Sequence, residues 1–115
     1  MCGVLGCFSK SGSEISKKYF EEINSGLDML HHRGPDNKSI ISSSNNSLLL
    51  GHRRLAIIDL TPDSNQPFTK NKNKYLSFNG EIYNYKEIAS QFFSKERLRT
   101  NSDTEILYEI LLKDP

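Results

Sequence analysis

The sequence predicts an α+β fold on two observations. Apolar runs of strand length are grouped in blocks, and three other segments carry apolar residues at helical spacing. Grouped strands and helices are typical of α+β layering rather than of strict βαβ alternation. The 115 residues, 36% hydrophobic and 25% charged, suffice for one domain, residues 1–115. A chain of this length buries roughly two-thirds of its unfolded surface.

The chain is expected to begin with a strand and a helix. Residues 2–8 (CGVLGCF) form a short apolar run that is typical of a buried strand. From residue 15 to about residue 31, apolar side chains recur at intervals of three or four positions, which predicts an amphipathic helix. Ser11 and Glu14, just before it, have the spacing of a capping box.

Four further strands are expected in the middle of the chain. Residues 38–43 and 47–52 form two short β-like runs around a polar turn. Residues 54–60 (RLAIIDL) and 74–80 (KYLSFNG) give two more. The sequence therefore places most of its strands before residue 81.

Two helices are expected to close the chain. Residues 84–93 have helical spacing, with Asn84 in a capping position. Residues 101–115 begin with Ser102 and Glu105, which have capping-box spacing, and continue with a stripe of isoleucine and leucine.

Charge and cysteine content narrow the class of protein. The net charge is +1 and the basic residues are scattered, which argues against nucleic acid or an anionic membrane as the main partner. No apolar run approaches the roughly 20 residues that cross a bilayer, and the N-terminus does not resemble a signal peptide. A bond between Cys2 and Cys7 would close only a tiny loop. Free thiols and a cytoplasmic location are therefore expected.

Cys2 is the first candidate for chemistry because it directly follows Met1. Methionine is removed when the second residue is small, and removal would leave a thiol and a free α-amino group on one residue. An α-amine has an ordinary pKa of about 7.7–8.0, so it can act as the base for its own thiol near neutral pH. Position alone favours the alternative, a small apolar residue at the end of the chain.

Cys7 continues the apolar run, and a buried structural thiol is expected there. A zinc site would have to combine Cys2 and Cys7 with His31, His32 or His52. Their spacing matches no familiar zinc finger or ribbon, so no metal site is expected.

Arg53 and Arg54 are adjacent in a β-like region. Neighbours on a strand point to opposite faces, so one guanidinium is expected to face a cleft and the other to face solvent. The cleft arginine suits bidentate binding of a ligand carboxylate. A salt bridge to Asp36 or Asp59 is an equally open alternative.

Two other features each have two interpretations. Asn79 and Gly80 are favoured as a hairpin turn, yet a side-chain amide beside a glycine N–H also makes a pair of donors for an oxyanion. Asp103 begins the last helix, where the helix dipole favours a carboxylate without any function. It is also suited to accept a ligand ammonium group.

In this order, Met-Cys-Gly, HRGPD, GHRRLAIIDL, FNGEIYNY and SDTE closely resemble the N-terminal glutaminase domain of glutamine-hydrolysing asparagine synthetases. These are class II glutamine amidotransferases with an N-terminal-nucleophile (Ntn) hydrolase fold. The resemblance covers essentially the whole chain. It implies an αββα sandwich of antiparallel sheets. The family's glutaminase domain is longer, so the sandwich is expected to be incomplete at its C-terminal side, and the synthetase domain to be absent.

The resemblance also implies roles for individual residues. Cys2, after loss of Met1, would attack the side-chain amide of glutamine, and the oxyanion would lie between the Asn79 side chain and the Gly80 N–H. Arg54 would pair with the α-carboxylate, while Asp103 and the neighbourhood of Glu81 would hold the α-ammonium. The pocket floor would consist of Leu55, Ala56, Ile57 and Ile58.

The same resemblance implies glutamine as the substrate and no cofactor for its hydrolysis. ATP and Mg would be needed only by a synthetase domain or subunit, the implied partner, which would use the ammonia to make asparagine. A homodimer is compatible with it. Two alternatives stay open, namely a non-catalytic fragment or remnant that keeps the motifs, and a small metal-binding domain.

Overall fold

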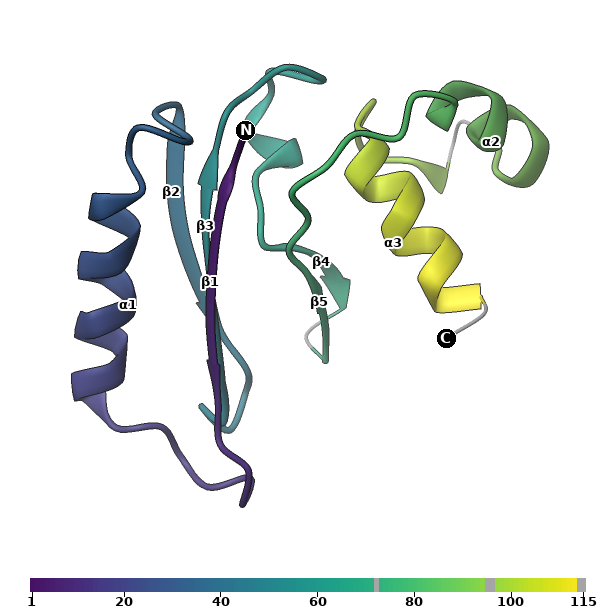
Figure 1. The fold of residues 1–115 in the computed structure, drawn as a ribbon. Coiled ribbons are helices and arrows are strands. Elements are labelled where there is room, and N and C mark those ends of the chain that lie inside the picture. Colours follow the sequence, from purple (N-terminus) through teal and green to yellow (C-terminus); the bar gives the residue numbers. More distant parts are fainter. Residues whose placement is uncertain (72, 95–96, 114–115) are drawn as a thin grey trace.

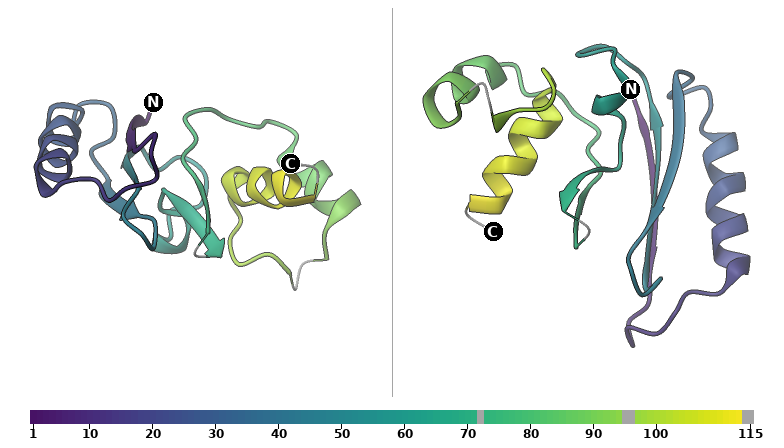
Figure 2. Two further views of the ribbon diagram at one scale, coloured as in Figure 1. Left: turned by 90° about the horizontal axis from the view of Figure 1, so that it is seen from below. Right: turned by 180° about the vertical axis from the view of Figure 1, so that it is seen from behind.

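The computed structural model describes residues 1–71, 73–94 and 97–113, and it is a mixed α+β fold with antiparallel sheets, as predicted. Figure 1 shows α1 on one outer side, the two sheets in the middle, and α3 on the other side. The two further views in Figure 2 keep this order of layers. The described elements are β1 (Gly3–Phe8), α1 (Lys17–Met29), β2 (Asn37–Ser42), β3 (Leu48–Arg54), a short 3₁₀ turn (Pro62–Ser64), β4 (Phe68–Asn71), β5 (Lys74–Leu76), α2 (Tyr85–Phe92) and α3 (Asp103–Lys113).

The first sheet has the order β1-β3-β2, with both pairs antiparallel. Its register sets Gly3 opposite Arg53 and Asn37 opposite Arg54. The start of β1 and the end of β3 therefore lie side by side. This pairing brings Cys2, the residue just before β1, next to Arg54 and the segment that follows it.

Helix α1 covers one face of this sheet through close apolar packing. Leu27 of α1 is fully buried and Leu49 of β3 nearly so. A Cβ added at Gly51 would come within 2.7 Å of the Leu27 side chain, so glycine allows the helix to approach β3. The helix begins at Lys17 after Ser16, so the capping box predicted at Ser11 and Glu14 is wrong.

The predicted strand over residues 54–60 is also wrong, because β3 ends at Arg54 and the following residues are irregular. The reason is the Arg54 guanidinium, which donates hydrogen bonds to the backbone carbonyls of Ile58, Asp59 and Thr61. Asp59 also has a φ of 51°. Backbone wrapped around one side chain in this way cannot pair as an extended strand.

The predicted strand over residues 74–80 is shorter than expected, since β5 ends at Leu76. It pairs with β4, which the sequence did not predict because its residues Phe-Thr-Lys-Asn are mostly polar. Phe68 anchors β4 because its ring packs edge-to-face on Tyr108 of α3, with centroids 5.3 Å apart. Asn79 and Gly80 do not form the predicted hairpin turn. Positive φ occurs, among the described residues, only at Gly12, Asn46 and Asp59.

Both C-terminal helices are present, but their predicted caps are only partly formed. Asn84 makes no side-chain cap hydrogen bond to α2. The Ser102 hydroxyl accepts the Glu105 N–H at 3.3 Å, as predicted for α3. The Glu105 carboxylate does not return to Ser102. It accepts the backbone N–H groups of Arg99 and Thr100 instead, at 2.9 and 2.6 Å.

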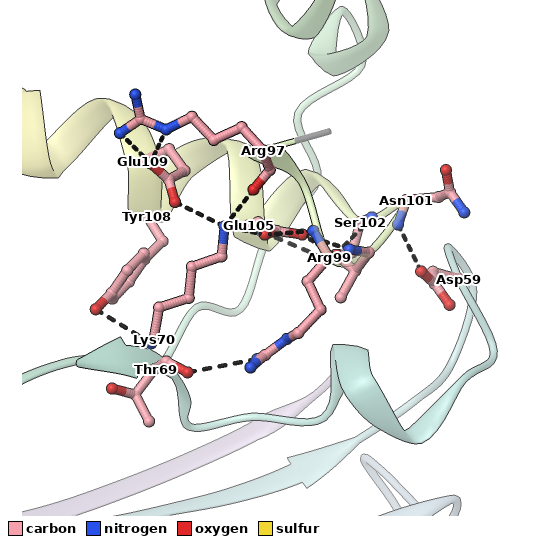
Figure 3. Close-up of polar contacts among 11 residues, drawn as sticks. Asp59, Thr69, Lys70, Arg97, Arg99, Asn101, Ser102, Glu105, Tyr108 and Glu109 are labelled. Atoms are coloured by element: carbon pink, nitrogen blue, oxygen red, sulfur yellow. Dashed lines mark hydrogen bonds and ion pairs between the residues drawn. The ribbon is translucent and has the colours of Figure 1, made fainter. Parts of the chain in front are cut away.

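Glu105 therefore lies at the centre of a buried polar network that holds residues 97–102 against α3 (Figure 3). The Lys70 ammonium from β4 forms ion pairs with Glu105 and, at 2.8 Å, with Glu109. Burial alone would raise the pKa of the Glu105 carboxyl. The hydrogen bonds from the Arg99 N–H, from Lys70 and from Thr100 outweigh that effect and lower it.

Candidate active site

A cavity of about 310 Å³ lies between the end of the first sheet and the start of α3. Five separate segments of the chain contribute to its wall. The predicted site residues that line it are Cys2, Arg54, Leu55, Ile57, Ile58, Asn79, Gly80, Glu81 and Asp103. Ala56 does not line it. Its N–H donates to the Asp36 carboxylate at 2.8 Å, on the outer side of the segment.

Cys2 is half-buried and is held by one backbone group and one side chain. The Leu55 N–H points at the Cys2 sulfur with a separation of 3.4 Å from nitrogen to sulfur. The Cys2 carbonyl accepts a hydrogen bond from Arg33 Nε at 3.0 Å. Met1 also lines the cavity and is 73% exposed.

The segment HRGPD does more than end a helix. Gly34 packs directly on β3, because an added Cβ would lie 2.4 Å from the Arg53 carbonyl carbon. The neighbouring Arg33 reaches Cys2, and Asp36 reaches Ala56. This turn therefore supports both Cys2 and the segment whose N–H contacts the Cys2 sulfur, a role the sequence did not reveal.

Both arginines are buried, so the expectation that one would face solvent is wrong. Arg53 points toward α1, where it donates to the Leu27 carbonyl at 2.8 Å and pairs with Asp28 at 2.9 Å. Carbonyls at a helix C-terminus attract a cation, which explains why the guanidinium is buried there.

Arg54 points toward the cavity and is 5% exposed. Its partners are the carbonyls of the wrapped segment and the Asn65 side-chain oxygen, at 2.9 Å. All of these oxygens are neutral, and no carboxylate pairs with Arg54 within the part of the chain that the structure describes. The predicted alternative of a salt bridge to Asp36 or Asp59 is therefore wrong. Arg54 therefore contributes to the cavity wall a positive charge that no described carboxylate pairs with directly.

Residues 78–82 carry Asn79 and Gly80 along the cavity, and we call them the oxyanion arm after the role predicted for these two residues. The arm is irregular and is held at its far end by Asp103, whose carboxylate accepts the Ile82 N–H at 3.0 Å. Asp103 is 6% exposed. Only one of its two oxygens has a hydrogen-bond partner among the described residues, so the other can accept a ligand donor.

His52 is fully buried, and its Nε2 lies 3.4 Å from the Phe78 carbonyl. Burial, aided by the charge of Arg54, lowers the pKa of His52 from 6.5 to about 4. The imidazole is therefore neutral near pH 7 and has a low affinity for a proton. It is a poor general base.

Several residues of the cavity wall were not predicted from the sequence. They come from the loop before β4, from residues 78–83 and from the start of α3, and they are Ser64, Gln66, Phe78, Tyr83, Ser102 and Thr104. The sequence did single out Ser102, but as a helix cap rather than as a residue of the cavity wall. The others lie in segments without periodicity, where nothing in the residue types marks an inward side chain.

Cys7 is half-buried rather than fully buried, and it lies on the α1 side of β1 with Gly3 and Leu5. No three His, Cys, Asp or Glu side chains gather to hold a metal ion in residues 1–71, 73–94 and 97–113. In the same ranges, no helix combines the length and apolar character needed to cross a membrane.

An α+β fold with antiparallel sheets, and a cavity lined by a cysteine next to the N-terminus, are features of the Ntn hydrolases. Comparison with known sequences names the family within that class. The profile of the glutamine amidotransferase domain matches residues 1–113, and the chain belongs to this family.

Individual relatives agree with this assignment. Amidase chry2 of Gibberella zeae is 36% identical over 115 residues, which covers 93% of this chain and 17% of the relative. The glutamine-hydrolysing asparagine synthetase 1 of Bacillus subtilis is 37% identical, with 93% and 17% covered. Asparagine synthetase B of Escherichia coli is 31% identical, with 93% and 19% covered. The chain thus spans less than a fifth of the length of these relatives.

Proposed function

We propose that this chain hydrolyses glutamine to glutamate and ammonia through a thioester on Cys2, once Met1 has been removed. One observation carries the proposal. A thiol, two potential oxyanion donors, a guanidinium and a carboxylate all line one cavity, although they come from four separate segments. The family to which the chain belongs acts on glutamine.

In the proposed reaction the α-amine of Cys2 takes the thiol proton, and the thiolate attacks the side-chain carboxamide carbon of glutamine. The Asn79 side-chain amide and the Gly80 N–H stabilise the oxyanion of the tetrahedral intermediate. The protonated amine returns its proton to the leaving nitrogen, and ammonia departs. Water then attacks the thioester, which releases glutamate and regenerates the thiol.

Substrate recognition in this proposal uses the two charges of the cavity. Arg54 pairs with the α-carboxylate of glutamine, and the free oxygen of Asp103 accepts its α-ammonium, with Glu81 close by. The apolar wall of Leu55, Ile57 and Ile58 contacts the methylene groups.

We further propose that the ammonia serves asparagine synthesis by a synthetase domain or subunit that uses ATP and Mg, in a cytoplasmic enzyme. Two of the relatives above are asparagine synthetases, and they are several times longer than this chain. The hydrolysis step itself needs no cofactor in this proposal. A non-catalytic remnant is the competing interpretation, and it predicts an intact cavity without turnover.

The test combines intact mass with covalent labelling. We expect the purified chain to lack Met1, to release glutamate and ammonia from glutamine, and to react once with 6-diazo-5-oxo-L-norleucine. Peptide mapping should place that label on Cys2. A chain that lacks Met1 but neither turns over glutamine nor takes the label would support the remnant and exclude the enzyme.

A further inference from the structure

Gln66 is a buried amide that joins two parts of the cavity wall. It lies in the loop before β4, is 6% exposed and lines the cavity. Its Oε1 accepts the Phe78 N–H at 2.6 Å, and its Nε2 donates to the Thr104 hydroxyl at 3.2 Å. The two partners directly precede Asn79 and directly follow Asp103.

We infer that Gln66 is a positioning residue for glutamine hydrolysis, because its amide fixes the oxyanion arm relative to the ammonium-binding end of α3. This inference rests on the proposed function. Gln66 takes no part in proton transfer and need not touch the substrate. It acts through Phe78 on the oxyanion donors.

The oxyanion arm needs such support because it lies outside any sheet. Strand β5 ends at Leu76, so ladder hydrogen bonds do not hold the residues that follow. Side chains hold them instead. Gln66 and His52 bind the Phe78 backbone at one end of the arm, and Asp103 binds Ile82 at the other.

Phe78 in turn sets the position of Gly80. An added Cβ at Gly80 would lie 2.6 Å from the Phe78 ring, so the glycine backbone packs directly on that ring. A shift of Phe78 therefore moves the Gly80 N–H, one of the two proposed oxyanion donors. Displacement of a reacting group by about 1 Å typically costs about 100-fold in rate.

The chemistry of this link favours an amide. The Phe78 N–H can only donate, so it requires the amide oxygen and turns the amide nitrogen toward Thr104. Methionine has nearly the same length and volume but offers neither group. Gln66→Met therefore removes both hydrogen bonds while the space stays filled.

The experiment measures kcat and KM for glutamine and two rates of Cys2 modification in Gln66→Met. Iodoacetamide reports the reactivity of the thiol, whereas 6-diazo-5-oxo-L-norleucine must also occupy the glutamine site. We expect kcat and the rate of diazo labelling to fall together by about 10- to 100-fold, with KM and the iodoacetamide rate within about twofold of the parent. Gln91→Met, on the exposed side of α2, should match the parent in every measurement.

Thr104→Val provides a second test, because it removes the acceptor for Nε2 and leaves the Phe78 hydrogen bond in place. We expect a smaller loss in kcat, about three- to tenfold. The inference is overturned if folded Gln66→Met keeps the parent kcat, or if its iodoacetamide rate falls as far as its diazo rate. If Gln66→Met does not fold, a parent-like kcat in Thr104→Val overturns it. A parent chain that resists the diazo reagent would instead refute the proposed function itself.

Discussion

The two halves of the molecule position their site residues by different means. In the N-terminal half, a ladder of backbone hydrogen bonds between β1, β3 and β2 holds Cys2, the proposed nucleophile, next to Arg54. In the C-terminal half, buried side chains bind the backbone of loops. Gln66 and Asp103 hold the oxyanion arm, and Glu105 holds the segment that leads to Asp103.

This difference indicates which site residues can be displaced by a single substitution. A strand ladder consists of many neutral backbone hydrogen bonds, so one side-chain substitution changes its geometry little. A loop fixed by one buried charge loses its support when that charge or its partner is removed. We therefore expect substitutions on both sides of the cavity to impair glutamine hydrolysis. We expect the free energy of unfolding to depend on charge and pH mainly through the buried side chains that contact loops.

The largest effect should come from the nucleophile on the ladder side. Cys2→Ala removes the sulfur that forms the proposed thioester, so glutamine hydrolysis should be abolished, as measured by glutamate release. Cys7→Ala, on the same strand but facing α1, should keep the parent rate. Turnover at the parent rate by Cys2→Ala would refute the mechanism.

A smaller but still large effect is expected on the loop side. Asn79→Ala removes one oxyanion donor and should lower kcat by about 100- to 1000-fold with little change in KM. Asn84→Ala, five residues away, is the matched control because that side chain makes no cap hydrogen bond. Equal kcat in the two variants would show that the arm does not bind the oxyanion.

The third prediction compares the lysine partner of a buried carboxylate with that of an exposed one. Lys70→Met leaves the fully buried Glu105 without its ion-pair partner, and we expect it to lower the free energy of unfolding by about 3 kcal/mol. Lys38→Met breaks a pair with the exposed Asp28 and should scarcely move the denaturant midpoint. If urea unfolding showed the same loss of unfolding free energy in Lys70→Met and Lys38→Met, the buried network around Glu105 would not contribute more to stability than an exposed ion pair.

The smallest effect concerns pH. His52 has a folded pKa of about 4 against an ordinary value of 6.5, so between these values the unfolded chain binds a proton that the folded chain does not. Stability should therefore fall as the pH is lowered, by roughly 2 kcal/mol from pH 7.5 to pH 5. His52→Gln should flatten this slope in urea unfolding, whereas His32→Gln, at an exposed position, should leave it unchanged. If the pH dependence of stability were unchanged in His52→Gln, it would have to arise from other titrating groups.

Regular elements were the part of the fold that the sequence predicted well. Strand β1 and the three helices carry periodic apolar residues, and such periodicity is a local property. The irregular segment after Arg54 was mistaken for a strand, since its residues are apolar and β-compatible. The contacts that bend it lie between its carbonyls and one guanidinium, and no pattern of residue types reveals them.

The residues of the candidate site also fall into a group that the sequence predicted and a group that it did not. Cys2, Arg54, Asn79 and Asp103 were found from the sequence because each belongs to a motif of the resemblance. Gln66 was missed because its partners are the backbone of Phe78 and the hydroxyl of Thr104, one 12 and the other 38 residues away. Such long-range pairing depends on tertiary structure rather than on spacing.

Met1 is accessible at the mouth of the cavity while Cys2 is already held by Leu55 and Arg33. An exopeptidase can therefore trim a chain that has finished folding, and nothing around the sulfur has to rearrange afterwards. We expect the cavity to be assembled but inactive before Met1 is removed. Removal of Met1 would then free the α-amine of Cys2 and widen the entrance of the cavity in a single cleavage.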